Sequence, residues 1–421
     1  MIEEIIYSVK TFYLNCDKPT FFFALAIINQ VVGFTPQIPS VGFYAIMILY
    51  ALYQLYTMRH FNSALLLFLL YVPLNILVTH PAPVFKSWER YILFITLLIS
   101  VSPLLIGRRT AILRMSIFKI LIFSCAVLGV GSFICRFIGI NYGTNELQTN
   151  LFAVGTFGGL CNHSMLLGPI AGVGVIYMTK LAYQTRKKMY YVFALMCLFA
   201  VMFSASRAAL IGTISGLVVM LYKQSGSAGR FMKGAVAFTL IASLTFTLWG
   251  SALDDVIAKN DANIAGGGFT SSRTNKWMMR VEEFKNNPVL GVGFVAVDLR
   301  SAMAASDADM ERGVVETGSS WLCILSMTGL IGALLLIPIF FSAFRTAWNK
   351  KTEMSPIILG ILTMFYIHMI AEGYVLAGGS FLAFTVWLTV GLAYDQKSIR
   401  TFRMRKKDLK LLLSAKHNRP V

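Results

Sequence analysis

Charged residues are scarce in this sequence. Of its 421 residues only 13% are Asp, Glu, Lys or Arg, whereas 57% are hydrophobic, and the mean hydropathy is +0.68. A soluble globular domain typically has about 25% charged residues. A composition this poor in charge excludes an ordinary soluble domain and indicates a polytopic membrane protein, because lipid-facing helices have no use for charged side chains.

Motifs for metal, nucleotide and nucleophilic chemistry are also missing. The six cysteines are scattered without a CxxC, so neither a disulfide framework nor a zinc site is indicated. The acidic pairs Asp254–Asp255 and Asp307–Asp309 have no His or Cys partner at ligand spacing. There is no P-loop, GxGxxG or Ser-His-Asp arrangement. We therefore expect neither a metal nor a cofactor, and an energy source that arrives with the substrate.

Long apolar runs are what the sequence does have. Runs of about 17–25 residues, the length that crosses a bilayer core, recur along the whole chain. We predict an all-α, polytopic integral membrane protein that forms a single membrane domain over residues 1–421. About twelve transmembrane helices are expected, near residues 20–35, 38–57, 62–79, 91–106, 116–138, 164–182, 190–204, 208–222, 234–252, 320–344, 356–376 and 379–394.

The positive charges are unevenly placed and predict the orientation. Most of the 37 Lys and Arg residues lie near the N-terminus, in short connections on one side, or in the basic tail 395–421. The positive-inside rule makes this side cytoplasmic and places both termini in the cytoplasm. The tail is expected to anchor the topology and to bind anionic membrane lipids. We expect no nucleic-acid partner, since basic runs beside membrane helices are common.

One long polar segment breaks the apolar pattern. Residues 253–319 contain ten of the 19 acidic residues, and the predicted topology makes them a large extracytoplasmic (periplasmic) loop. Within it Trp277, Val281 and Phe284 recur at i, i+4 and i+7, which predicts an amphipathic helix with an apolar stripe. Arg273 falls in the first turn of this helix. Because a helix N-terminus has free N–H groups and a positive partial charge, an arginine there suits an anion.

A second arginine lies within an apolar stretch, where burying its charge in a membrane is unfavourable. The stretch "FSASRAALIG" (203–212) puts Arg207 between two apolar runs. A guanidinium at membrane depth costs several kcal/mol by most estimates, and such residues usually face a bundle interior or an aqueous cavity. The alternative is an interfacial arginine whose head reaches the lipid headgroups.

Five sequence blocks together resemble a known family. They are "GGLCNHSMLLGP" (158–169), "FSASRAAL" (203–210), "SSRTNKWMMRVEEFKNNPVLGVGF" (271–294), "ETGSSWLCILSMTGLIG" (316–332) and "HMIAEGYVLAGG" (368–379). In this order and at these membrane positions they resemble the O-antigen ligase/polymerase superfamily of bacterial inner-membrane glycosyltransferases. The N-terminal 140 residues match only in hydropathy. The resemblance implies a GT-C-like membrane fold.

The resemblance also implies a reaction. A polysaccharide chain is transferred from undecaprenyl diphosphate to a sugar hydroxyl at the outer face of the inner membrane. The acceptor is the lipopolysaccharide core in ligases and the end of another lipid-linked repeat unit in polymerases. Where ligases look like H[N/S], this sequence has Gly318 and Ser319. The missing histidine favours a metal-independent polymerase of O-antigen or a related polysaccharide, with a chain-length regulator protein as a further partner.

Three residues are expected to carry the chemistry. Arginine stays charged and binds phosphate oxygens bidentately, so we assign the leaving diphosphate to Arg207 and Arg273 and expect both in one cavity. Glu372 interrupts an apolar stretch and is expected to act as base or orienting group for the acceptor hydroxyl. The alternative for Glu372 is a helix-end carboxylate that is bound to a neighbouring group.

Other residues of the five blocks are expected to bind substrate. They are Asn162, His163, Trp277, Arg280, Glu316 and Ser319. Glu316 is also the second choice for the base, because it lies beside Gly318. A lone histidine such as His163 is more often structural, which is the alternative for that residue.

Two other functions remain open. An O-antigen ligase differs from a polymerase only in its acceptor, the lipopolysaccharide core. A polysaccharide or lipid transporter or flippase would also use twelve helices and buried arginines. Transporters commonly show internal repeats with paired broken helices, however, and no repeat is visible here.

Overall fold

The part of the chain that the structure describes is mostly helical. This computed structural model describes residues 17–58, 60–143, 157–227, 229, 232, 271–299 and 317–395. The helices there are α2 (Lys18–Asn29), α3 (Ser40–Leu55), α4 (Ser63–Thr79), η1 (Pro83–Phe85), α5 (Ser87–Val101), α6 (Arg108–Ile138), α7 (Ser164–Thr185), α8 (Met189–Phe203), α9 (Arg207–Ser225), α13 (Ser271–Asn286), α15 (Ser320–Asn349), α16 (Ser355–Ala371) and α17 (Phe381–Asp395). Two short strands, β1 (His60–Phe61) and β2 (Leu105–Ile106), pair antiparallel. The prediction of an all-α protein is confirmed.

Several helices are built to cross a membrane. Within the described ranges α6, α7, α9 and α15 are long and apolar enough to span one, and α2, α3, α4, α8, α16 and α17 are shorter apolar helices. Helices thus occupy the positions of eleven predicted spans, while the count of twelve stays a prediction. The ninth predicted span, 234–252, lies outside the described residues, as do most of the 253–319 loop and of the basic tail.

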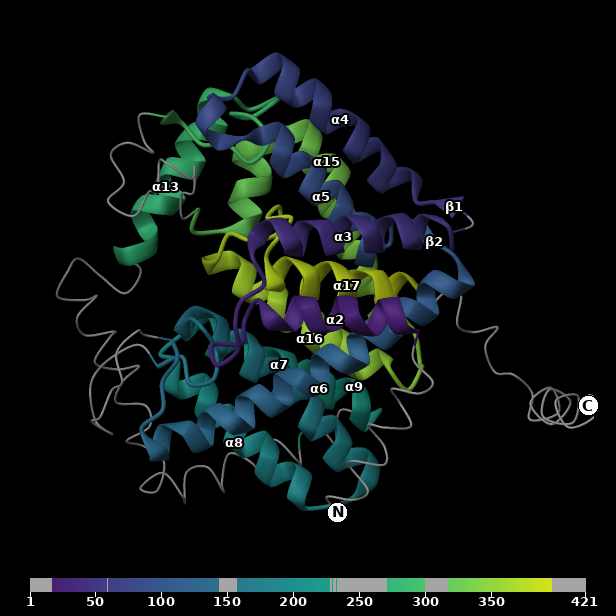
Figure 1. Cartoon of the computed structure of the whole chain (residues 1–421), viewed down its shortest axis with the longest axis vertical. Coiled ribbons are helices and arrows are strands. Elements are labelled where there is room, and N and C mark those ends of the chain that lie inside the picture. Colours follow the sequence, from purple (N-terminus) through teal and green to yellow (C-terminus); the bar gives the residue numbers. More distant parts are fainter. Residues whose placement is uncertain are drawn as a thin grey trace, which may run out of the picture.

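The helices form one bundle, with α13 at one end. In Figure 1, α2, α3 and α17 run side by side across the middle, α4, α5 and α15 lie above them, and α6 to α9 lie below. The β1–β2 ladder is at the right end of this bundle and α13 at the left end. The predicted topology would make the left end the extracytoplasmic side, and this orientation stays a prediction.

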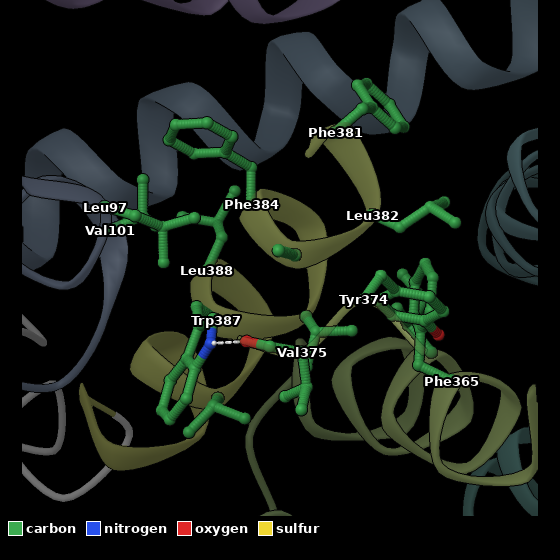
Figure 2. Packing of buried hydrophobic residues seen from close by; sticks show 14 of the residues in the cluster. Leu97, Val101, Phe365, Tyr374, Val375, Phe381, Leu382, Phe384, Trp387 and Leu388 are labelled. Carbon is green, nitrogen blue, oxygen red and sulfur yellow. Dashed lines mark hydrogen bonds between the residues drawn. The ribbon is translucent and has the colours of Figure 1, made fainter. Parts of the chain in front are cut away.

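Helix α17 lies in the core of the bundle and holds the segment that precedes it. It is apolar all round and buried along nearly its whole length, as expected for a helix surrounded by protein. Phe384 and Leu388 pack near Leu97 and Val101 of α5 in Figure 2. The indole Nε1 of Trp387 donates a hydrogen bond of 3.0 Å to the carbonyl oxygen of Val375. This bond ties the connection between α16 and α17 to the core.

Helices α9 and α16 pack antiparallel through glycine. A Cβ added at Gly216 would lie 2.5 Å from the carbonyl oxygen of Gly360, and one at Gly212 would lie 2.7 Å from that of Met364. Only residues without a side chain allow backbones to approach so closely, as in GxxxG pairs of membrane helices. This contact fixes the register of α9 against α16.

A buried ion pair joins α6 to the end of α17. The guanidinium of Arg114 donates to both carboxylate oxygens of Asp395, at 2.8 Å from Nε and 2.6 Å from Nη2. Its Nη1 donates to the carbonyl oxygens of Ser102 and Leu105, both at 3.0 Å. The two side chains are only 2% and 6% exposed. The pair therefore links three segments at the β1–β2 end of the bundle.

Candidate functional site

A pocket lies between the start of α7 and the end of α16. Its volume is about 520 Å³. The lining residues are Asn162, His163, Met165, Leu166, His368, Glu372, Gly373, Tyr374 and Leu382. We call it the first pocket. Three residues predicted for the site, Asn162, His163 and Glu372, thus line one cavity. The first two lie far from Glu372 in the sequence, so it is the fold that brings them together.

His163 and Asn162 are positioned by the turn before α7. His163 is the N-cap of this helix, and its Nδ1 accepts a hydrogen bond of 3.1 Å from the backbone N–H of Met165. The amide nitrogen of Asn162 donates to the carbonyl oxygen of Gln30 at 2.7 Å. The first turn of a long helix therefore borders the pocket, and such a helix end favours an anion.

Arg273 and Glu372 meet beside this pocket. The guanidinium of Arg273, in the first turn of α13, forms an ion pair with the carboxylate of Glu372, the C-cap of α16. Their side chains are 19% and 15% exposed, so both are largely withdrawn from solvent. The cation predicted for the diphosphate and the carboxylate predicted for the acceptor hydroxyl are direct neighbours.

Arg207 begins α9 at the same end of the bundle. The residue before it, Ser206, caps the helix, and Ala205 adopts the left-handed conformation with φ 51°, which makes the turn from α8 sharp. Because α9 and α16 pack antiparallel, Arg207 at the start of α9 lies at the end of this helix pair where α16 ends. Arg207 is half-buried there and is not among the residues that line the first pocket, so its place in one cavity with Arg273 stays a prediction.

Trp277 holds α13 against the segment that contains Gly318. Its indole Nε1 donates a hydrogen bond of 3.1 Å to the carbonyl oxygen of Gly318. Gly318 is left-handed, with φ 76°, and a Cβ there would come within 2.8 Å of the Cβ of Lys276. Neither the backbone nor the space at this position suits a side chain, so this chain could not hold a histidine here without rearrangement.

We predict that Gly318→Ala lowers the thermal stability of the purified protein in detergent. The left-handed conformation costs an L-residue roughly 1–2 kcal/mol, and the contact with Lys276 adds to that cost. Gly226→Ala is the matched control, because Gly226 is also left-handed at φ 63° but has nothing within 4 Å of an added Cβ. Equal melting temperatures for the two variants would contradict the proposed contact with α13.

Arg280 is a buried residue of α13 and is paired within this helix. Its guanidinium lies 2.7 Å from the carboxylate of Glu283, and the two side chains are 2% and 3% exposed. Glu283 also accepts a hydrogen bond of 2.8 Å from the backbone N–H of Asp298. Burial raises the pKa of Glu283, while Arg280 and this N–H oppose the rise. Arg280 therefore supports the docking of α13, and its predicted contact with substrate stays a prediction.

The buried face of α13 differs from the apolar stripe expected from the sequence. Val281 is 37% exposed, whereas Arg280 and Glu283 are buried. Val281 thus lies away from the buried face of α13, although it belongs to the predicted apolar stripe. The reason is that two opposite charges at i and i+3 compensate each other when buried together, so a charged pair can take the place of apolar contact.

Two serines at the start of α15 hold the end of α16. The hydroxyl of Ser319, which is 2% exposed, caps α15 and donates to the carbonyl oxygen of Met369 at 3.3 Å. The hydroxyl of Ser320 donates to the carbonyl oxygen of Glu372 at 2.7 Å. It also accepts from the backbone N–H groups of Tyr374 at 3.0 Å and Val375 at 3.3 Å. Ser319 thus acts as a cap, and Ser320 fixes the backbone around Glu372.

Three residues at the site, Ser320, His368 and Tyr374, were not predicted from the sequence. Ser320 fixes the backbone of Glu372 through a hydrogen bond to its carbonyl oxygen. His368 and Tyr374 line the first pocket, and the ring nitrogen Nδ1 of His368 lies 3.1 Å from the hydroxyl oxygen of Tyr374. His368 lies one helical turn before Glu372, and this i, i+4 spacing was the available signal. Of the predicted residues, Glu316 lies outside the described part of the chain.

Comparison with known proteins gives one family match. The family model described as O-antigen ligase matches residues 192–337 of the chain. The matched region contains Arg207, Arg273 and Gly318, whereas His163 and Glu372 lie outside it. No curated protein matches the chain.

Proposed function

We propose, on the premise that residues 192–337 form an O-antigen ligase family domain, that this membrane protein is a polysaccharide polymerase. It joins undecaprenyl-diphosphate-linked repeat units at the outer face of the bacterial inner membrane, with both termini in the cytoplasm. The observation that carries the proposal is the Arg273–Glu372 ion pair at the edge of the first pocket. It combines a fixed cation and a carboxylate where a diphosphate leaving group and a sugar hydroxyl must meet.

The residues divide the reaction between them. The diphosphate of the donor binds Arg207 and Arg273, which neutralise the charge that develops as the bond between the sugar C1 and the phosphate oxygen breaks. The electron pair of that bond leaves with the diphosphate. The hydroxyl oxygen of the acceptor bonds to C1, and its proton passes to the carboxylate of Glu372. Binding of the diphosphate draws Arg273 from Glu372 and frees the carboxylate for the hydroxyl.

The surroundings of Gly318 favour polymerisation over ligation. The position at which ligases are expected to have a histidine has no side chain here and no room for one beside Lys276. Proton acceptance then falls to a group elsewhere in the site, and Glu372 is the carboxylate that lines the first pocket. The ligase alternative keeps the same donor chemistry and differs in the acceptor.

Exchanging the two charges tests whether the ion pair is catalytic or only structural. Arg273→Glu and Glu372→Arg alone should each reduce polymer formation more than about 10²-fold. The double variant restores an ion pair, so its melting temperature should recover towards that of the unmodified protein. Its activity should stay lost, because the cation no longer faces the diphosphate from α13.

The control for the exchange is Glu282→Gln, which removes an exposed carboxylate from α13. It should leave both melting temperature and polymer formation unchanged. Recovery of activity together with stability in the double variant would show that the pair only docks α13, and would refute its catalytic role.

A further inference from the structure

A second pocket lies on the other side of the segment that follows Glu372. Its volume is about 340 Å³. Tyr44, Phe85, Arg90 and Thr317 line it, together with residues 373–380. Gly373 and Tyr374 line both pockets, so they form a partition between them. Glu372 faces the first pocket and Thr317 the second, directly beside this partition.

The partition is thin and firmly held. A Cβ at Gly373 would lie 1.8 Å from the hydroxyl oxygen of Thr317, so no side chain fits between them. The hydroxyl of Ser320 hydrogen-bonds backbone groups of Glu372, Tyr374 and Val375, in and beside the partition. The indole of Trp387 donates to the carbonyl oxygen of Val375 (Figure 2). The two pockets are thus separated by a single stretch of backbone that lies directly after Glu372.

The second pocket has the chemistry of a sugar site. Tyr44 offers an aromatic ring, against which the apolar face of a sugar can pack, and the buried Phe85 is a second aromatic residue of the lining. Arg90, in the first turn of α5, contributes a guanidinium and interacts electrostatically with Tyr44. A few polar groups among apolar and aromatic ones are typical of pockets that orient a small ligand.

We propose that the second pocket holds the terminal sugar of the acceptor repeat unit, with Arg90 and the Tyr44 hydroxyl as its recognition groups. This inference rests on the proposed function, because a polymerase must hold two glycans at once. Reacting atoms have to come within about 3–3.5 Å of each other. The two pockets share Gly373, next to Glu372, so an acceptor held by its sugar in the second pocket passes its hydroxyl over this segment to reach a donor in the first.

The test uses a glycan that can accept but not donate. The free repeat-unit oligosaccharide, without lipid or diphosphate, is titrated against the full-length protein with lipid-linked donor held constant. Arg90→Gln should raise the KM for this acceptor about tenfold and Tyr44→Phe by several fold, the loss expected for one ligand hydrogen bond. The KM for the donor should change less than about twofold. Lys86→Gln, which removes an exposed positive charge at the same end of the bundle, should change neither value.

The outcomes separate this inference from the proposed function. Direct binding of the free glycan, measured without donor, should weaken in Arg90→Gln. An unchanged acceptor KM in both variants, or an equal rise in the donor KM, would overturn the inference. So would loss of phosphatidylglycerol binding in Arg90→Gln with glycan binding intact, since the pocket would then hold a lipid headgroup. A protein that binds the glycan through Arg90 but forms no polymer would retain the pocket and overturn the proposed polymerase.

Discussion

Glu372→Gln is expected to slow polymer formation by roughly 10²–10⁴-fold, the range for lost general acid–base catalysis. Glutamine keeps the size of the side chain, and its amide oxygen can still accept a hydrogen bond from Arg273. The docking of α13 onto α16 should therefore survive, and only the charge is removed. The rate of polymer formation by purified protein, measured at saturating lipid-linked repeat unit, gives the effect directly.

The controls separate charge at the site from charge in general. Glu89→Gln removes an exposed carboxylate that lines neither pocket and should leave the rate unchanged. Donor binding and melting temperature should be nearly normal in Glu372→Gln. A variant with unchanged rate and polymer length would exclude Glu372 as the base and transfer that role to another carboxylate, with Glu316 the next choice.

Arg114→Ala is expected to lower the free energy of unfolding by about 3–5 kcal/mol, the usual effect of removing one partner from a buried ion pair. Asp395 would stay in an environment where it is only 6% exposed, without a counter-charge. The carbonyl oxygens of Ser102 and Leu105 would lose their donor as well. Denaturation of the protein in detergent, followed to its midpoint, measures the loss.

Two comparisons make this result specific. Arg109→Ala removes an exposed arginine of the same helix and should cost less than about 1 kcal/mol. Arg114→Met combined with Asp395→Leu removes both charges and should be less harmful than Arg114→Ala, because no charge is left buried alone. If Arg114→Ala and Arg109→Ala cost the same, the pair does not stabilise the bundle as described.

Hydropathy predicted the helices well where a run is apolar and less well at its ends. The run predicted at 116–138 belongs to α6, which already begins at Arg108. The first turns of this helix contain charged residues, and a hydropathy window does not count such turns as part of the apolar run. The run at 20–35 ends as a helix at Asn29, and Val32 then forms a bridge with Cys161. Such long-range pairing leaves no trace in a local window.

The break inside α15 could not be predicted from its apolar sequence. Gly329 has φ 62° and ψ −169°, and a Cβ there would lie 2.2 Å from the carbonyl oxygen of Val289. The segment after α13 thus enters the side of this helix. A glycine within an apolar run predicts weak helix propensity, but the segment that packs against it comes from elsewhere in the chain.

Part of the site could be predicted from the sequence, and there is a physical reason why the rest could not. Arg273, Glu372, Asn162 and His163 carry polar groups in apolar or motif-rich stretches, so each was visible singly. The structure places Asn162, His163 and Glu372 on the wall of one pocket and pairs Arg273 with Glu372. Ser320 was not visible, because its role depends on three backbone groups more than 50 positions away. Contacts of that kind follow from packing, not from local pattern.

The most direct test of the central claim is the product that the purified protein makes from lipid-linked repeat units alone. We expect a ladder of lengths in the absence of lipopolysaccharide core, since another repeat unit serves as acceptor. Adding the core should not be needed and should not convert the ladder to a single capped species. A product that forms only with the core, as one capped glycan without a ladder, would contradict the polymerase and identify a ligase that works with glycine at position 318.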